Sequence, residues 1–291
     1  MGLGETLAIL SALAWSAGVI IYKRLGETIA PTRLNLMKNL IVLGFMAPSL
    51  ALIGGPPPRL GAADLAITLL SGTLGIAVAD SLYLTALNRL GAARMGVLGN
   101  FYSPFVILLS VLFLGERLAP LQVLGFVLVT SGVLVVGARA ATTPAERREL
   151  RRGLALGIGS IALMALAIVM VKRVLETQPL IWMVALRLFG GVGGLLLLFA
   201  WRRESPWAPT GGAPVRWPVV LAGAFVGQYL SMLFWLGGYK YTSASVAAIL
   251  NETTSIFIVL LAAAFLGEAL TRRKLFGVAL TVSGVACMLL S

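Results

Sequence analysis

The chain has 291 residues, of which 59% are hydrophobic and 12% are charged, and its mean hydropathy is +0.96. A soluble domain of this length carries about twice that charged fraction, so the composition excludes a soluble fold with a polar exterior. The formal net charge of +12 would suggest nucleic-acid binding in a soluble protein. Here Lys and Arg flank apolar runs, where they anchor helices in a bilayer, so the expected partner is lipid and not nucleic acid.

The apolar runs are close to 20 residues long, which is the length that crosses a hydrocarbon core of about 30 Å as a helix. Membrane β-barrels instead show short segments of alternating hydrophobicity. The sequence therefore predicts an all-α integral membrane protein. Ten transmembrane helices are expected near residues 5–22, 32–53, 63–87, 92–114, 119–138, 152–172, 179–201, 217–239, 243–266 and 274–290.

The first three predicted helices contain Trp15, Lys38, and Asp80 with Tyr83, in that order. An ionisable group inside a membrane helix costs roughly 2.5–3.5 kcal/mol on insertion scales, so it faces a cavity or a partner. Asp80 either lines a substrate cavity, with Tyr83 and Trp15, or pairs with Lys38. A proton-coupling role is a further candidate for Asp80.

The fourth predicted helix carries the cluster Asn100-Phe-Tyr-Ser103, followed directly by Pro104. Proline lacks an N–H and clashes with the carbonyl four residues earlier, which is that of Asn100. A kink at Pro104 would present this carbonyl together with neighbouring side chains. Asn100, Tyr102 and Ser103 are therefore candidate substrate-binding residues, although such kinks also occur in membrane helices without a binding role.

A markedly polar segment, residues 141–152, follows the fifth predicted helix. It separates a first five-helix unit at residues 1–140 from a second at residues 153–291. The sequence therefore predicts two units joined by a polar linker.

The second unit contains Arg187 in its second helix, Trp235 in its third, and Asn251-Glu-Thr-Thr-Ser255 in its fourth. Trp235, Asn251, Glu252 and Ser255 are candidate substrate-binding residues. Apolar surroundings favour the neutral form of a carboxyl group, which suits uptake and release of a proton, so Glu252 is the first candidate for proton coupling. The structural alternative is an ion pair between Glu252 and a cation such as Arg187.

The two units repeat one another. Phe113-Leu-Gly-Glu116 recurs as Phe265-Leu-Gly-Glu268, and Asn100 matches Glu252 at the same spacing. Earlier in each unit the spacing differs by three residues, and Lys38 matches Arg187. Matching positions indicate a shared structural task for these two cations, with binding of a substrate carboxylate as the alternative. Glu116 and Glu268 precede the next helix and are expected to cap its free N–H groups.

Five helices is an odd number, so the second unit must enter the membrane upside down relative to the first. Inverted repeats are a common plan for secondary transporters, with the substrate site near the midplane between the repeats. Loops on the side of the termini hold five Lys and Arg residues, whereas the opposite loops hold 16. The positive-inside rule therefore predicts that both termini lie outside the cell.

Enzymatic chemistry finds no support in the sequence. The chain has no histidine, no metal-ligand spacing and no phosphate-binding glycine loop, so neither a metal nor a cofactor is expected. Asp80 is one of only two aspartates, which argues against the paired aspartates of an intramembrane protease. Cys287 is the single cysteine and cannot form an internal disulfide.

Several short motifs together resemble the EamA family of the drug/metabolite transporter superfamily, once in each unit. The first-unit motifs are Asn100–Val106, Phe113–Gly125 and Ser131–Gly132, and Trp15 and Arg187 also fit the pattern. The resemblance implies ten helices in two five-helix repeats and transport of amino acids, other metabolites or drugs. It also implies a central cavity among the first, third, fourth, sixth, eighth and ninth helices. Two departures from the pattern are Lys38, where the second unit has Arg187, and Ile256, where the first has Pro104.

The expected function is alternating-access transport of small metabolites, with export of amino acids favoured and coupling to protons left open. One alternative is a flippase for lipids or lipid-linked sugars on the same scaffold. Another is a non-transporting membrane assembly subunit. The expected location is the inner cell membrane, as a monomer or a homodimer.

Overall fold

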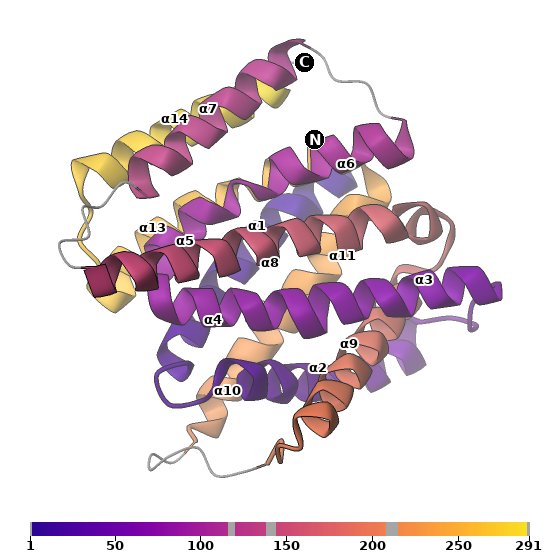
Figure 1. The fold of residues 1–291 in the computed structure, drawn as a ribbon. Coiled ribbons are helices and arrows are strands. Elements are labelled where there is room, and N and C mark those ends of the chain that lie inside the picture. The colour runs from indigo at the N-terminus through magenta and orange to yellow at the C-terminus, as the bar shows by residue number, and fades with distance from the viewer. Residues whose placement is uncertain (1, 116–119, 138–143, 208–214, 290–291) are drawn as a thin grey trace.

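The computed structural model describes residues 2–115, 120–137, 144–207 and 215–289, and within these ranges all regular structure is helical (Figure 1). The all-α prediction is therefore confirmed. The elements are α1 (Leu3–Leu25), α2 (Pro31–Ile53), α3 (Ala62–Gly72), η1 (Thr73–Ala79), α4 (Asp80–Leu90), α5 (Ala92–Gly99), α6 (Tyr102–Leu114), α7 (Pro120–Gly137), α8 (Pro144–Thr177), α9 (Leu180–Arg202), α10 (Trp217–Ala224), η2 (Phe225–Leu230), α11 (Ser231–Tyr241), α12 (Ala244–Asn251), α13 (Thr253–Leu266) and α14 (Arg272–Leu289).

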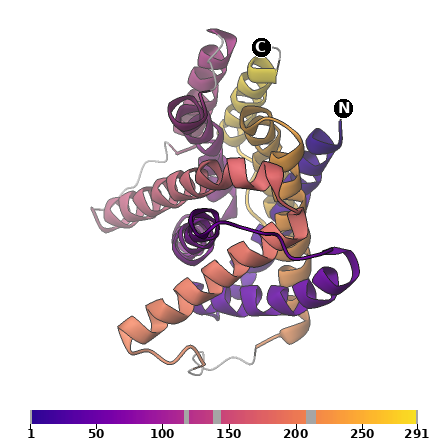
Figure 2. The same ribbon diagram turned by 90° about the vertical axis from the view of Figure 1, so that its right-hand side faces the viewer.

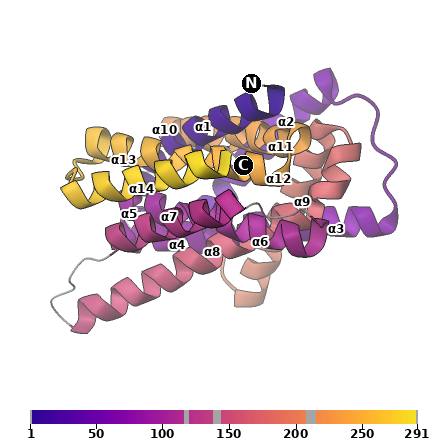
Figure 3. The same ribbon diagram turned by 90° about the horizontal axis from the view of Figure 1, so that it is seen from above.

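Eight helical segments in the described chain are long and apolar enough to cross a membrane. They are α1, α2, α3 with η1 and α4, α5 with α6, α8, α9, α10 with η2 and α11, and α12 with α13. The two helices outside this set, α7 and α14, span 18 residues each and pack against each other along one side of the bundle (Figures 1 and 3). The predicted ten-span topology thus has eight candidate spans among the described residues.

Two repeat-related glycines end the helices that carry the predicted polar clusters. Gly115 follows α6 with φ 77°, and Gly267 follows α13 with φ 67°, a left-handed conformation that glycine adopts without steric cost. The carboxylate of Glu268 then accepts hydrogen bonds from the backbone N–H groups of Ala92 and Ala93, at 3.0 and 3.4 Å. The capping expectation for Glu268 was therefore wrong about the target, because the capped helix is α5 in the other half; Glu116 lies outside the described residues.

The segment expected as a polar linker is partly helical. Residues 144–151 form the first turns of α8, which is 34 residues long and begins well away from the other helices (Figure 3). A proline at the first helical position, Glu146 in the first turn, and a run of Ala, Glu, Arg and Leu all favour helix there. The sixth helix therefore starts eight residues earlier than predicted, because charge alone does not prevent helix formation outside an apolar core.

The two halves pack mainly against each other. Helix α1 packs against α11 and α13, while α8, its counterpart in the second half, packs against α4 and α6 (Figures 1 and 2). Glycines permit the closest approaches: a Cβ on Gly18 would overlap the backbone of Gly227 in η2. The matching crossing of α8 with η1 brings the Cβ of Ala167 to 3.2 Å from the position of a Cβ on Gly75. Small residues allow close packing of membrane helices, and here they bring the halves together around their common centre.

Candidate functional site

A cavity of about 160 Å³ lies between the two halves. A cavity needs roughly 10–15 Å³ by the same measure to hold one water molecule, so this space can accept a small solute. Its wall comes from every predicted cavity helix together with α9. The lining residues are Ser11, Trp15, Gly75, Ile76, Asp80, Tyr83, Met95, Gly96, Gly99, Asn100, Tyr102, Ile161, Met164, Arg187, Gln228, Ser231, Met232, Trp235, Asn251, Glu252, Thr254, Ser255 and Ile258.

The predicted substrate-binding residues converge on this cavity, although they come from five different helical segments. All of them except Ser103 contribute to its wall. The side chain of Ser103 is fully buried, and its backbone N–H donates a hydrogen bond to the Oε1 atom of Glu252, at 2.8 Å. Ser103 therefore contacts the predicted coupling residue without lining the cavity.

Lys38 belongs to a buried polar network on one side of the cavity. Its Nζ atom lies 2.7 Å from Oδ2 of Asp80 and 2.7 Å from Oε1 of Gln228. The same Nζ lies 5.3 Å from the ring centroid of Tyr22 and 5.8 Å from that of Trp15. The network joins α2 to α4 and, across the halves, to η2, and it contains the Lys38–Asp80 pair considered from the sequence.

Asn35 and Asn39 extend this network along α2. The Nε2 atom of Gln228 donates to Oδ1 of Asn39, at 3.2 Å, and Nδ2 of Asn39 donates to Oδ1 of Asn35, at 2.9 Å. Nδ2 of Asn35 in turn donates to the carbonyl of Ile76 and to the hydroxyl of Ser81. Buried amides whose partners are satisfied in this way fix the relative positions of the helices that carry them.

Arg187 has a different environment, although it occupies the matching position. Its Nη1 atom donates to the hydroxyl of Ser71 and, at 3.3 Å, to the carbonyl of Ala167, while its guanidinium carbon lies 5.5 Å from the ring centroid of Trp235. Its Nε atom is buried and has no hydrogen-bond partner. No salt bridge among the described residues includes Arg187 or Glu252, so the ion pair considered for these two does not form.

Glu252 lies at a break in the helix that contains it. Helix α12 ends at Asn251 and α13 begins at Thr253, and at the matching position α5 ends at Gly99 and α6 begins at Tyr102. The Glu252 side chain is buried, with its residue 3% exposed. Its carboxylate accepts the N–H of Ser103 in the first turn of α6, where free backbone N–H groups and the helix dipole favour negative charge.

The breaks do not depend on proline. Pro104 is the third residue of α6, where its missing N–H costs little. The second half has Ile256 at this position and nevertheless breaks at Glu252. There, two hydroxyl groups donate to backbone carbonyls three residues earlier: Thr253 to Leu250 at 2.8 Å, and Ser255 to Glu252 at 3.0 Å. The first half is thus broken beside Pro104, and the second half, without a proline, is broken where hydroxyl groups compete for backbone carbonyls.

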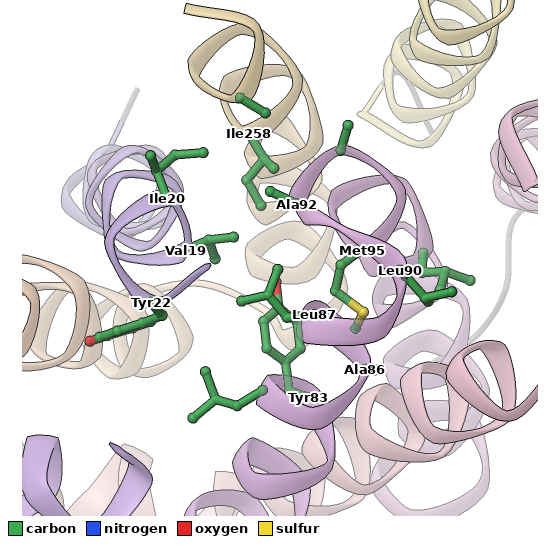
Figure 4. Close-up of a cluster of buried hydrophobic side chains, with 14 of the residues drawn as sticks. Val19, Ile20, Tyr22, Tyr83, Ala86, Leu87, Leu90, Ala92, Met95 and Ile258 are labelled. Atoms are coloured by element: carbon green, nitrogen blue, oxygen red, sulfur yellow. The ribbon is translucent and has the colours of Figure 1, made fainter. Parts of the chain in front are cut away.

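Two buried apolar clusters lie toward opposite ends of the helices that line the cavity. One includes Tyr83, Met95 and Ile258, which also form part of the cavity wall (Figure 4). It extends to Leu25 and Leu90, near the C-terminal ends of α1 and α4. The other cluster gathers residues from α8, α9, α11 and α12, including Leu175, Met183, Leu236, Tyr239 and Ala247. The two apolar clusters thus lie on opposite sides of the cavity along the bundle.

Gln228 is the main residue of the site that the sequence did not single out. It lies in η2, is 5% exposed, and connects Lys38 to Asn39. An uncharged side chain in an apolar segment gives little signal, and its importance follows only from its partners. Among the residues that the structure describes, no group of three or more His, Cys, Asp or Glu residues could hold a metal ion.

Comparison with known proteins places these features in a family context. The model of the EamA-like transporter family matches residues 2–138 and again residues 151–290. The uncharacterized transporter YvbV of Bacillus subtilis (strain 168) is 27% identical over 224 residues, which cover 75% of this chain and 70% of that protein. A crystal structure of a protein that is 19% identical superposes with a TM-score of 0.74 and covers 99% of this chain and 96% of the other, which shows a common fold.

Proposed function

Since this chain belongs to the EamA-like transporter family, a family of transporters rather than enzymes, we propose that it is a secondary transporter that exports small metabolites such as amino acids. It is a multi-pass membrane protein, and its proposed location is the inner cell membrane. The observation that carries this proposal is the cavity of about 160 Å³, which lies between the two halves and is lined by three charged side chains: Asp80, Arg187 and Glu252.

The proposed mechanism is alternating access between two inverted repeats, with α7 and α14 as the fifth helix of each. Three structural features occur in both halves and support it: a broken helix at the cavity, a π-helix in the preceding segment, and the crossing of the first helix over the π-helix of the other half. π-Helices and broken helices mark functional hinges and substrate sites in membrane transporters. Opening of one apolar cluster while the other stays closed would expose the cavity to one side at a time.

Coupling to protons is assigned to Glu252. As a carboxylate, Glu252 accepts the Ser103 N–H and links α13 of the second half to α6 of the first. Protonation removes the negative charge from the first turn of α6 and weakens this link. Asp80 is a less suitable coupling residue, because its carboxylate is held by Lys38 at 2.7 Å.

The proposal is tested with purified protein in proteoliposomes loaded with a panel of radiolabelled amino acids. Net efflux and solute exchange are measured with and without an imposed pH gradient for the wild type and for Glu252→Gln. We expect the gradient to accelerate wild-type efflux, whereas the variant retains exchange and loses the response to the gradient. Glu149→Gln removes an exposed carboxylate far from the cavity and serves as the matched control.

Other results would change the conclusion in defined ways. If Glu252→Gln kept both the wild-type efflux rate and its dependence on the gradient, the coupling role would be wrong. Movement of fluorescent lipids without any flux of solutes would instead establish the flippase. A stable partner protein retained in mild detergent, together with no flux at all, would indicate an assembly subunit.

A further inference from the structure

We propose that Arg187 is the anion-binding group of the cavity, so that the transported substrates carry a carboxylate or a comparable small anion. The inference rests on the proposed function because it takes the cavity as the substrate site. Its basis is the difference between the two intramembrane cations, which occupy matching positions in the two halves.

The guanidinium of Arg187 is hydrogen-bonded through Nη1, and its Nε has no partner among the described residues. Nη1 is bound by the Ser71 hydroxyl and the Ala167 carbonyl, whereas Nε is buried and has no partner. The residue is 2% exposed and forms part of the cavity wall. A guanidinium can offer two parallel N–H donors to one carboxylate, which suits a planar anion bound within the cavity.

The acid that neutralises Lys38 has no counterpart beside Arg187. Asp80 binds Lys38 at 2.7 Å. Asn100 and Glu252 are related by a spacing of 152 residues, and the same spacing matches Asp80 with Met232. Met232 also lines the cavity. The second half thus keeps the cation and replaces its internal anion with an apolar side chain.

A buried charge without a counter-ion is costly, by several kcal/mol in real proteins. Lys38 offsets this cost in a direct ion pair with Asp80. Arg187 hydrogen-bonds two neutral oxygen acceptors and faces Trp235, and Asp80 acts on it only through space, without a direct contact. An anion that enters the cavity would supply the missing counter-charge. The electrostatic gain on binding is large in such a site because little water is present to screen it.

Two glycines allow α9 to approach α3 and η1 closely at Arg187. A Cβ on Gly72 would collide with the backbone carbonyl of Arg187, and a Cβ on Gly75 would lie 3.2 Å from its Nη2 atom. The close approach of the backbones fixes α9 against α3, and the hydrogen bonds of Nη1 to Ser71 and Ala167 hold the guanidinium at the cavity wall. A preorganised guanidinium loses little entropy when an anion binds.

The test uses the full-length protein in detergent and matched ligand pairs at constant ionic strength. The pairs are L-phenylalanine with its amide, L-leucine with its amide, and phenylacetate with phenylacetamide. Binding is measured by thermal unfolding and by calorimetry. We expect the carboxylate member of at least one pair to bind about tenfold or more tightly than the amide, since buried charge-assisted contacts are worth several kcal/mol when broken.

Two different variants should remove this preference. Arg187→Gln removes the cation, and Met232→Asp introduces the missing acid while leaving Arg187 in place. Met232→Asn is the matched neutral control and should keep the preference, as should Arg187→Lys in weaker form. If Arg187→Gln fails to fold, Met232→Asp still decides the question.

The proposal is overturned if no carboxylate binds, if amides bind as tightly, or if the preference survives in either folded variant, Arg187→Gln or Met232→Asp. Flux assays separate this failure from failure of the proposed function. Transport of neutral or cationic solutes that depends on Glu252 but not on Arg187 would refute the anion site and leave the transporter intact. Absence of flux for every solute would refute the proposed function itself.

Discussion

Lys38 and Arg187 match in sequence position but differ in every contact of their charged groups. Lys38 has an acid, an amide oxygen and two aromatic rings around its ammonium group. Arg187 has a hydroxyl, a carbonyl and one ring. The first set of contacts neutralises its cation within the protein, and the second does not. One member of the matched pair is therefore paired with an acid, and the other forms part of the cavity wall.

The Lys38–Asp80 pair should behave as a buried ion pair. Asp80→Asn alone leaves an uncompensated ammonium group, and we expect it to lower the free energy of unfolding by about 3–5 kcal/mol. The double variant Lys38→Met with Asp80→Leu removes both charges and should recover much of that loss. Unfolding in detergent by urea or heat measures both. Equal stability of Asp80→Asn and the wild type would contradict the pairing.

Two kinds of helical irregularity occur at matching places in the two halves. The π-helices η1 and η2 precede α4 and α11, and the breaks at Asn100 and Glu252 follow in the next segments. Each places polar backbone or side-chain groups beside the cavity. Non-helical backbone is tolerated at membrane depth only where protein or a cavity surrounds it, so these irregularities indicate a functional centre.

The crossing of α1 with η2 depends on the absence of side chains. We expect Gly18→Leu to lower the free energy of unfolding by about 1–3 kcal/mol, because the added side chain meets the backbone of Gly227. Gly44→Leu is the matched control, since no heavy atom lies within 4 Å of a Cβ at that position in α2. Thermal unfolding in detergent compares the two variants. A loss of stability of similar size in Gly44→Leu would show that replacing a helical glycine is destabilising in itself and that the crossing of α1 with η2 is not the cause.

Many large apolar side chains are exposed on the described helices, as a lipid-facing surface requires. Leu197 is 72% exposed and Leu112 is 65% exposed. Trp201, Trp207 and Trp217 are also exposed and flank the chain between α9 and α10. Tryptophan concentrates at membrane interfaces, so this end of α9 and α10 is expected to lie at the level of the lipid headgroups.

The orientation of the molecule can be tested with cysteines at exposed positions on opposite sides. In a Cys287→Ser background, Ser205→Cys lies after α9 and Ser243→Cys lies between α11 and α12. The loop charges predict that Ser243→Cys reacts with an impermeant maleimide on intact cells, whereas Ser205→Cys reacts only after permeabilisation. The opposite labelling pattern would place both termini inside.

Much of the architecture follows from local properties of the chain. Helix positions follow from apolar runs and from Gly and Pro at their ends, so nearly all predicted boundaries lie within a few residues of the observed ones. The one large difference, the start of α8, arose because hydropathy indicates where a membrane begins and not where a helix does. The duplication is likewise visible in the sequence, and it puts Asn100 and Glu252 at equivalent positions in the two halves.

The helical membrane fold, the duplication and most of the residues that line the cavity could be predicted from the chain, because apolar length, repeated motifs and the cost of intramembrane charge are local properties. The partners of those charges could not be predicted in this way. Lys38 forms an ion pair with Asp80 and donates a hydrogen bond to Gln228. Glu252 accepts a hydrogen bond from the N–H of Ser103, and Arg187 forms no ion pair among the described residues. These contacts join helices that are far apart in the chain, so they depend on how the halves pack and leave no signal in local sequence.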